Sequence, residues 1–230
     1  PKINIIGLVG NTSTGVTYES LYPNFHNIDL PIISSIKDID WTNVDVIFSC
    51  LPHGASQEVI SSIYDSVDTI IDLSADFRLK DPDLYQCLYG EKHIFPAYLK
   101  KSIYGLTEFN RKKLLGAKLV ACPGCYPTAV QLGFLPLLEA GLVDAGSLVA
   151  SCASGTSGAG RSAKVNLLLT ESAETMKSYG VSGHRHLPEM EQGLARMTED
   201  PVSLTFVPHL APMVRGIHAT LIATLTDQSA

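Results

Sequence analysis

Cys125 is the residue whose type and position most directly predict covalent chemistry in this sequence. It lies in the stretch Ala121–Thr128, after an apolar run at 117–120 that is typical of a strand and before an apolar run at 129–138 with helical spacing. The start of a helix carries roughly half a positive charge and several free N–H groups, so it stabilises a thiolate, the nucleophilic form of cysteine. The stretch therefore predicts a nucleophile where a strand turns into a helix.

The spacing of Cys122 and Cys125 also allows other interpretations. A Cys-x-x-Cys pair can be a redox couple, half of a metal site or two buried side chains, and the spacing alone favours none of them. The chain has five cysteines in all, an odd and sparse set that fits a reducing compartment better than a disulfide framework.

A second cluster that could do chemistry is His184-Arg185-His186. A cysteine and a histidine far apart in sequence are the minimum for thiol catalysis, and histidine both accepts and donates a proton near neutral pH. A histidine pair that only packs in the core, or half of a metal site completed by Cys122 and Cys125, would account for the same residues.

The stretch Ser154–Arg161 combines three glycines and three hydroxyl side chains in its first seven residues. Glycines let a backbone approach a ligand closely, and successive backbone N–H groups bind anionic groups. A surface loop is the alternative, but the position between two structured runs and the terminal Arg161 favour a ligand contact. Together with a nucleophilic cysteine, this stretch indicates hydride transfer to or from a thioester.

The elements that must position these residues begin with three apolar runs typical of buried parallel strands, at 3–9, 44–51 and 68–73. A helix is predicted at 55–64, so the runs form β-α-β units. Ligands of open α/β sheets bind at the carboxyl ends of the strands. His53, Asp76 and Arg78 follow such ends, where loop capping or a local ion pair is the alternative to binding.

The loop after the first run, Gly10–Gly15, lacks the G-x-G-x-x-G spacing of a dinucleotide fingerprint. If the run is instead the second strand of a Rossmann-type half, this loop would contact the adenosine ribose. NAD-binding proteins usually carry an acidic residue there. Asn11, Thr12 and Ser13 provide none, which favours the 2′-phosphate of NADP.

The rest of the chain divides at the Cys125 helix. Residues 80–101 are polar and contain proline, which predicts an irregular connection, and Thr107 is the expected cap of a short helix. After the Cys125 helix we expect strands at 147–153, 202–207 and 217–226 and helices at 167–176 and 188–197. This order predicts an antiparallel α+β domain.

Composition argues against several classes of function. The 230 residues are 45% hydrophobic and 17% charged, with a net charge of −6 and no basic run, so a nucleic-acid partner is not expected. No apolar run approaches the ~18 residues of a membrane-spanning helix, so no membrane partner is expected, and no signal peptide is visible. The low share of charges suggests that another subunit or missing chain covers part of the surface.

The chain resembles the N-acetyl-γ-glutamyl-phosphate reductases of arginine biosynthesis, and the resemblance runs from end to end. Pro-Gly-Cys-Tyr-Pro-Thr at 123–128 and Gly-His-Arg-His-x-Pro-Glu at 183–189, in this order, form a highly specific pair. Further matching stretches are Leu51–Gly54, Asp72–Arg78, Tyr104–Leu106 with Glu108 and Asn110, Ser154–Arg161, and Pro208–Gly216. Cys122 stands where many members carry asparagine, which makes the Cys-x-x-Cys spacing a coincidence.

The resemblance implies NADPH-dependent reduction of N-acetyl-γ-glutamyl phosphate to N-acetylglutamate 5-semialdehyde, with phosphate release, through a thioester on Cys125. His184 matches the acid/base histidine of the family, and no metal is implied. The implied substrate-binding residues are His186, Glu189, Arg215 and Arg78. The expected cofactor-binding residues are Asn11, Thr12, Ser13, Leu51, Pro52, His53, Ser74, Ser154, Gly155, Ser157, Gly158, Ala159 and Gly160.

The expected fold class is α/β, with an incomplete Rossmann-type NADP-binding domain at 1–123 followed by an α+β catalytic and dimerisation domain at 124–230. The resemblance implies a first strand and glycine-rich turn ahead of Pro1 and more of the substrate domain past Gln228, and both are expected to be missing here. The resemblance also implies a cytoplasmic homo-oligomer, a dimer or tetramer, or a plastid protein if the source is a plant.

Two alternatives stay open. The chain could be a non-catalytic fragment or assembly module of this family. It could also be a relative of the aspartate-semialdehyde dehydrogenase type, which shares the thioester mechanism, although the stretch 183–189 argues against it.

Overall fold

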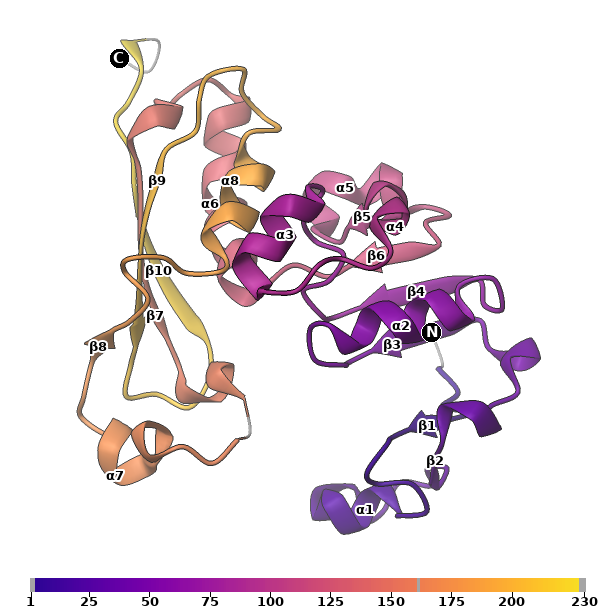
Figure 1. Ribbon diagram of the computed structural model, residues 1–230. Coiled ribbons are helices and arrows are strands. Elements are labelled where there is room, and N and C mark those ends of the chain that lie inside the picture. Colours follow the sequence, from indigo (N-terminus) through magenta and orange to yellow (C-terminus); the bar gives the residue numbers. More distant parts are fainter. Residues whose placement is uncertain (1–2, 161, 228–230) are drawn as a thin grey trace.

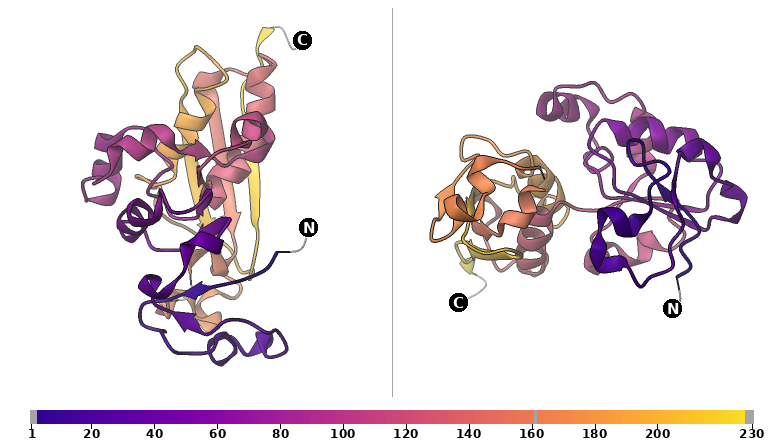
Figure 2. Two further views of the ribbon diagram at one scale, coloured as in Figure 1. Left: turned by 90° about the vertical axis from the view of Figure 1, so that its right-hand side faces the viewer. Right: turned by 90° about the horizontal axis from the view of Figure 1, so that it is seen from below.

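The computed structural model describes residues 3–160 and 162–227 of the chain. Figures 1 and 2 show two bodies side by side. The first body extends up to strand β6 (Leu119–Ala121), and the second starts with helix α6 (Cys125–Glu139). Cys125 therefore lies where the chain passes from one body to the other.

The first body is built on a parallel sheet of four strands. In the order in which they pair, these are β3 (Val46–Ser49), β4 (Thr69–Asp72), β6 and β5 (Ile103–Tyr104). Helix α2 (Ala55–Ile63) connects β3 to β4, and its Ile60 packs in one core with Ile70 and Leu119. Gly54 precedes the helix at a φ of 83°, which glycine adopts without strain. The predicted β-α-β unit is confirmed.

Strands β1 (Leu8–Val9) and β2 (Ile33–Ser34) form a separate parallel pair. The predicted strand at 3–9 is therefore too long, because only its last two residues pair, and Ile3 is 77% exposed. An apolar run becomes a strand only where another strand satisfies its backbone groups. The short helical segments around this pair are α1 (Tyr18–Leu21), η1 (Pro23–Phe25), η2 (Ile36–Asp38) and η3 (Trp41–Asn43).

Residues 80–101 are not the irregular connection predicted from sequence, because they contain helices α3 (Pro82–Tyr89) and α4 (Pro96–Lys101). Each begins with proline, whose fixed φ suits the first position of a helix. The Asp81 carboxylate caps α3 by accepting a hydrogen bond from the Asp83 N–H at 2.8 Å.

The cap predicted for helix α5 (Thr107–Leu114) is wrong by one residue. Thr107 is the first residue of the helix, and the N-cap position belongs to Leu106, whose side chain makes no capping hydrogen bond. The buried side chain of Asn110 ties the helix to β5 by donating to the Tyr104 carbonyl at 2.9 Å.

The second body is a four-stranded mixed sheet. Its strands pair in the order β10 (Ile217–Ile222), β7 (Leu148–Ser154), β9 (Leu204–Leu210) and β8 (Lys177–Ser178). The expected antiparallel sheet is wrong at its centre, because β7 and β9 run parallel. The connection between them crosses over through helix α8 (Leu187–Leu194), and such a crossover brings the chain back in the same direction.

Helices α6 and α8 lie on one side of this sheet (Figure 1). Alternate residues of β7, among them Leu148 and Ala150, are buried against Val130 of α6 and Met190 of α8. The predicted helix at 167–176 is only the four residues of α7 (Leu169–Ser172). The remaining short segments are η4 (Ala145–Ser147), η5 (Thr156–Ala159) and η6 (Val165–Leu167).

Candidate active site

Cys125 is an exposed thiol at the first residue of α6, as the strand-to-helix pattern predicts. Gly124 is the N-cap, and its carbonyl accepts hydrogen bonds from the backbone N–H and the side-chain hydroxyl of Thr128, both at 2.9 Å. A Cβ at Gly124 would lie 2.7 Å from Nε2 of His186, so only glycine allows this approach. The turn thereby places the thiol beside the histidine cluster.

The buried side chain of Glu189 holds the start of α6 in place. Its carboxylate is 2% exposed and accepts hydrogen bonds from the Gly124 N–H at 2.9 Å and the Tyr104 hydroxyl at 2.8 Å. It also forms a 3.5 Å ion pair with Arg78. Burial raises the pKa of Glu189, while the charge of Arg78 and the hydrogen bonds oppose that rise.

Arg78 uses each nitrogen of its guanidinium group within the protein. Nε donates to the Cys122 carbonyl at 2.7 Å, Nη2 donates to the Leu73 carbonyl at 2.9 Å, and Nη1 faces Glu189. The side chain therefore braces the turn that leads into Cys125. The substrate contact predicted for Arg78 and Glu189 stays a prediction, and their contacts support a positioning role.

His184 lies in an aromatic cage. Its ring centroid is 5.6 Å from that of Tyr126 and 5.3 Å from that of Phe206. Its Nδ1 accepts a hydrogen bond from the His186 backbone N–H at 3.1 Å, so the neutral ring carries its proton on Nε2. Burial, and secondly the charge of Arg185, lower the pKa of His184, which keeps the ring neutral near pH 7.

His186 precedes α8 and is 7% exposed. Its ring centroid lies 4.9 Å from that of His184. Burial, followed by repulsion from His184 when it is protonated and from Arg78 and Arg185, lowers the pKa of His186 to about 3. Its Nδ1 is buried and has no hydrogen-bond partner within residues 3–160 and 162–227.

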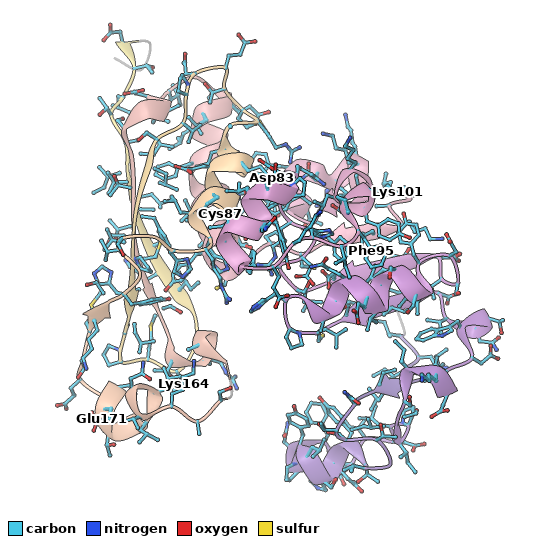
Figure 3. The ribbon with its side chains drawn as sticks, viewed as in Figure 1. Asp83, Cys87, Phe95, Lys101, Lys164 and Glu171 are labelled. Carbon is cyan, nitrogen blue, oxygen red and sulfur yellow. The ribbon has the colours of Figure 1, made fainter. Side chains whose placement is uncertain are left out.

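Cys125, His184 and His186 line one cavity of about 840 Å³. This volume is within the range of small-molecule sites. The loop after β7 contributes Ser154, Gly155, Gly158 and Ala159, and α3 contributes Cys87 and Leu88. Figure 3 shows Cys87 where α3 approaches the second body, so both bodies contribute to the wall.

The predicted cofactor residues fall into three groups in the structure. Asn11, Thr12 and Ser13 follow β1, and Leu51, Pro52, His53 and Ser74 follow β3 and β4. Ser154 is the last residue of β7, and Gly155 to Gly160 follow it. The first two groups lie at the carboxyl ends of parallel strands, as expected. The Ser74 hydroxyl is buried and donates to the Asp72 carboxylate at 2.6 Å. Arg161, the last residue of the predicted loop, lies outside the described residues.

Ser157 and Gly160 line a smaller cavity of about 260 Å³ that adjoins the same loop. Arg215 is exposed in the connection between β9 and β10 and is not part of the wall of the Cys125 cavity. Its backbone nitrogen would lie 2.7 Å from a Cβ at Gly155. Arg215 therefore adjoins the glycine-rich loop, and its substrate contact stays a prediction.

Sequence reasoning missed two tyrosines of this cavity. The hydroxyls of Tyr126 and Tyr179 lie 2.8 Å apart, and both rings contact His184. Their positions, directly after Cys125 and five residues before His184, were signals that the sequence offered. Burial raises the pKa of both hydroxyls, so they stay protonated donors at neutral pH.

The five cysteines are free thiols, and Cys122 is only partly buried. Within residues 3–160 and 162–227, no three side chains of His, Cys, Asp or Glu are grouped to hold a metal ion. The same residues include no helix that is long and apolar enough to cross a membrane.

The parallel-sheet body and the mixed-sheet body correspond to the two domains of the semialdehyde dehydrogenase class, with Cys125 at the helix start between them. The model of the semialdehyde dehydrogenase NAD-binding domain matches residues 1–117, and that of the semialdehyde dehydrogenase dimerisation domain matches residues 125–230. These matches confirm the expected fold class and the expected nicotinamide-nucleotide domain.

The chain belongs to the N-acetyl-γ-glutamyl-phosphate reductase family, as the resemblance in sequence predicts. It is 47% identical over 230 residues to the N-acetyl-γ-glutamyl-phosphate reductase of Pseudomonas fluorescens (strain SBW25). It is 49% identical over 232 residues to that of Pseudomonas aeruginosa (strain UCBPP-PA14). In both cases the match covers 100% of this chain and 67% of the relative.

Solved structures of aspartate-semialdehyde dehydrogenases share the fold. The aspartate semialdehyde dehydrogenase II of Vibrio cholerae, complexed with ASA, has a TM-score of 0.65 at 13% identity, over 95% of this chain and 65% of that one. The aspartate semialdehyde dehydrogenase of Candida albicans with NADP has a TM-score of 0.63 at 12% identity, over 97% of this chain and 64% of that one. The chain thus spans just under two thirds of these structures.

Proposed function

We propose that the protein carrying this chain reduces N-acetyl-γ-glutamyl phosphate to N-acetylglutamate 5-semialdehyde with NADPH and releases phosphate. One observation carries the proposal: Cys125, at the start of α6, shares a cavity with His184 in a chain of this family. The names of the relatives supply the substrate, and the site supplies a nucleophile and an acid for it.

Cys125 acts first as the nucleophile. Its thiolate attacks the carbonyl carbon of the acyl phosphate, so that a carbon–sulfur bond forms and the bond from that carbon to the phosphate oxygen breaks. Phosphate leaves with the electron pair and a thioester remains. The free N–H groups in the first turn of α6 are available to stabilise charge on the carbonyl oxygen.

His184 acts as a donor. Because its Nδ1 is occupied by the His186 N–H, the neutral ring donates from Nε2. This donor stabilises the Cys125 thiolate before the attack. It then protonates the oxyanion left when the thioester is reduced, which gives the neutral hemithioacetal. Nε2 takes the same proton back when the carbon–sulfur bond breaks to give the aldehyde and the Cys125 thiolate.

NADPH, when bound, supplies the hydride that reduces the thioester. Three groups of residues would hold it: Asn11 to Ser13 after β1, Leu51 to His53 with Ser74 after β3 and β4, and the glycine-rich loop after β7. The loop fits this role, because a Cβ at Gly158 would lie 2.9 Å from the Ser154 hydroxyl, so backbone rather than side chain forms this part of the cavity wall. The lack of an acid among Asn11, Thr12 and Ser13 supports NADP over NAD.

The division of labour between the bodies follows the same proposal. We place the NADP-binding domain at 1–123 and the catalytic domain at 124–230, since β6 and α6 flank this boundary. The dimerisation-domain match supports a homo-oligomer, a dimer or tetramer. The five free cysteines support a reducing compartment such as the cytoplasm.

The test is the phosphate-dependent reduction of NADP⁺ with N-acetylglutamate semialdehyde, measured on the intact protein and on Cys125→Ser. We expect activity in the unsubstituted protein and a loss of about three orders of magnitude or more in the variant. Absence of activity in both proteins would support the non-catalytic alternative instead.

A second readout uses alkylation near pH 7. We expect Cys125 to react faster than Cys50 and Cys87, which are also exposed, and faster than the buried Cys152. Equal rates at the three exposed thiols, or stoichiometric zinc in a metal analysis, would contradict thiol catalysis.

A further inference from the structure

The cavity beside Cys125 is a positive region in an acidic chain. The chain has 17 Lys and Arg residues against 23 Asp and Glu residues, a net charge of −6. Among the described residues that line the cavity there are three cations, Lys164, Lys177 and Arg185, and no Asp or Glu. A wall of this kind attracts an anion.

Lys177 and Arg185 are held on either side of one tight turn. Lys177 belongs to the edge strand β8 and pairs with Leu210 of β9. After β8, the Gly183 N–H donates to the Gly180 carbonyl at 3.2 Å, and Gly180 has a φ of 57°. A Cβ at Gly180 would lie 3.3 Å from Cδ2 of His184, so the turn folds back onto that ring. Arg185, the next residue, therefore faces the same cavity.

These two cations are available to a ligand in the cavity, unlike the two arginines predicted from sequence. Arg78 is engaged by Glu189 and two carbonyls, and Arg215 does not line the cavity. Lys177 and Arg185 are exposed, and in the part of the chain that the structure describes neither forms an ion pair.

Lys164 belongs to a different part of the cavity. It also lines the smaller cavity with Ser157 and Gly160 of the glycine-rich loop. Figure 3 shows Lys164 close to α7 and far from Cys87, although both line the large cavity. The large cavity is therefore elongated, and Lys164 marks the end next to the loop proposed to bind the cofactor.

We infer that Lys177 and Arg185 form a two-cation subsite that binds the phosphoryl group of the acyl phosphate and the inorganic phosphate it becomes. This inference rests on the reductase function proposed above. A phosphoryl group carries about two negative charges and suits two cations, and the guanidinium fork of arginine matches its oxygens. The group is attached to the carbon that Cys125 attacks, so it must lie near His184, the neighbour of Arg185. Both cations then stabilise the charge on the departing phosphate.

The first test measures the KM for inorganic phosphate in the direction of semialdehyde oxidation. We expect Lys177→Met and Arg185→Met each to raise it about ten-fold or more, while the KM for the semialdehyde changes less than about two-fold. Lys177→Arg keeps the charge and should retain most of the phosphate affinity. Lys112→Met, at an exposed position of α5, is the matched control and should change neither constant.

The second test does not depend on activity. Inorganic phosphate in the subsite should protect Cys125 from iodoacetamide, relative to sodium chloride at equal ionic strength. The phosphate concentration for half protection should rise about ten-fold in Lys177→Met and in Arg185→Met. If phosphate protects Cys125 but the protein shows no phosphate-dependent reduction of NADP⁺, the result would contradict the reductase function and still support the anion subsite.

Two results would overturn the subsite. One is an unchanged KM for phosphate together with unchanged protection of Cys125 in both methionine variants. The other is an increase confined to the KM for the semialdehyde, which would assign the two cations to its carboxylate. Because both side chains are exposed, the variants should keep the thermal unfolding midpoint of the unsubstituted protein, which checks that they fold.

Discussion

His186 is the residue of the site whose charge state is most strongly constrained by its surroundings. Its ring is buried, and the groups that face it are Arg78 and Arg185, which are positive, and His184, which becomes positive when it is protonated. Together with burial they lower its pKa from an ordinary 6.5 to about 3. The folded protein therefore keeps this ring neutral, which is the form that packs against Gly124 at the start of α6.

This pKa predicts how stability depends on pH. Between pH 6.5 and about 3 the unfolded chain binds a proton at His186 that the folded chain does not, so the free energy of unfolding falls as the pH falls. The contribution of His186 to the slope of the unfolding free energy against pH approaches about 1.4 kcal/mol per pH unit. His186→Gln should remove this part of the slope in urea unfolding curves taken across that range. The exposed His218→Gln is the control, and identical slopes in both variants would contradict the prediction.

At the residue scale, the sequence predicted two residues that come together in one cavity, but not the contacts that hold them there. Cys125 and His184 were predicted from a helix start and a proton carrier, and they share a cavity. The cavity positions of Lys177 and Arg185 could not be read from sequence, because they depend on the turn at Gly180. The sequence likewise could not show that Arg78 donates its hydrogen bonds to groups within the protein, because these acceptors come together only in the folded chain.

At the scale of elements, α6 depends on α8 for its position. The carboxylate of Glu189, in the first turn of α8, joins the N-cap of α6 to Tyr104 of β5 and to Arg78. One buried side chain thus links both bodies to the helix that carries Cys125.

Glu189→Ala should therefore destabilise the fold. The change leaves the Arg78 charge and the Gly124 N–H without their acceptor, and we expect a loss of about 3–5 kcal/mol in the free energy of unfolding. Glu189→Gln keeps an acceptor and should cost less. Glu139→Ala, at the exposed end of α6, should stay within about 0.5 kcal/mol. Urea unfolding followed by the fluorescence of Trp41 measures all three. Equal stability of Glu189→Ala and Glu139→Ala would contradict this role.

The features that the sequence did not reveal have two physical causes. Helix α3 buries only Tyr85 and α4 buries only Leu99, so neither shows an apolar period. The parallel pairing of β7 with β9 was missed because alternation gives the faces of a strand but not its direction. Strands β3, β4 and β6 were predicted because they are apolar runs that pair within a sheet.

At the scale of the whole molecule, the sheet of the second body has two unlike faces. Helices α6 and α8 lie on one side (Figure 1). The residues on the other side of its long strands are Val149, Ser151, Ala153, Thr205, Val207, His209, His218, Thr220 and Ile222, which include no Asp, Glu, Lys or Arg. Ile222 is 58% exposed. A partly apolar face without Asp, Glu, Lys or Arg suits the self-association that the dimerisation-domain match supports.

Ser151→Arg tests this face at its centre, since Ser151 pairs with Val207 on one side and Thr220 on the other. An arginine there would bury an unpaired charge in a dimer but stay solvated in a monomer, so the dissociation constant should rise at least about ten-fold. Ser62→Arg, exposed on α2 of the first body, should leave association unchanged. Sedimentation over a range of concentrations measures both variants. If Ser151→Arg associates as tightly as the unsubstituted protein, the subunits meet through another surface.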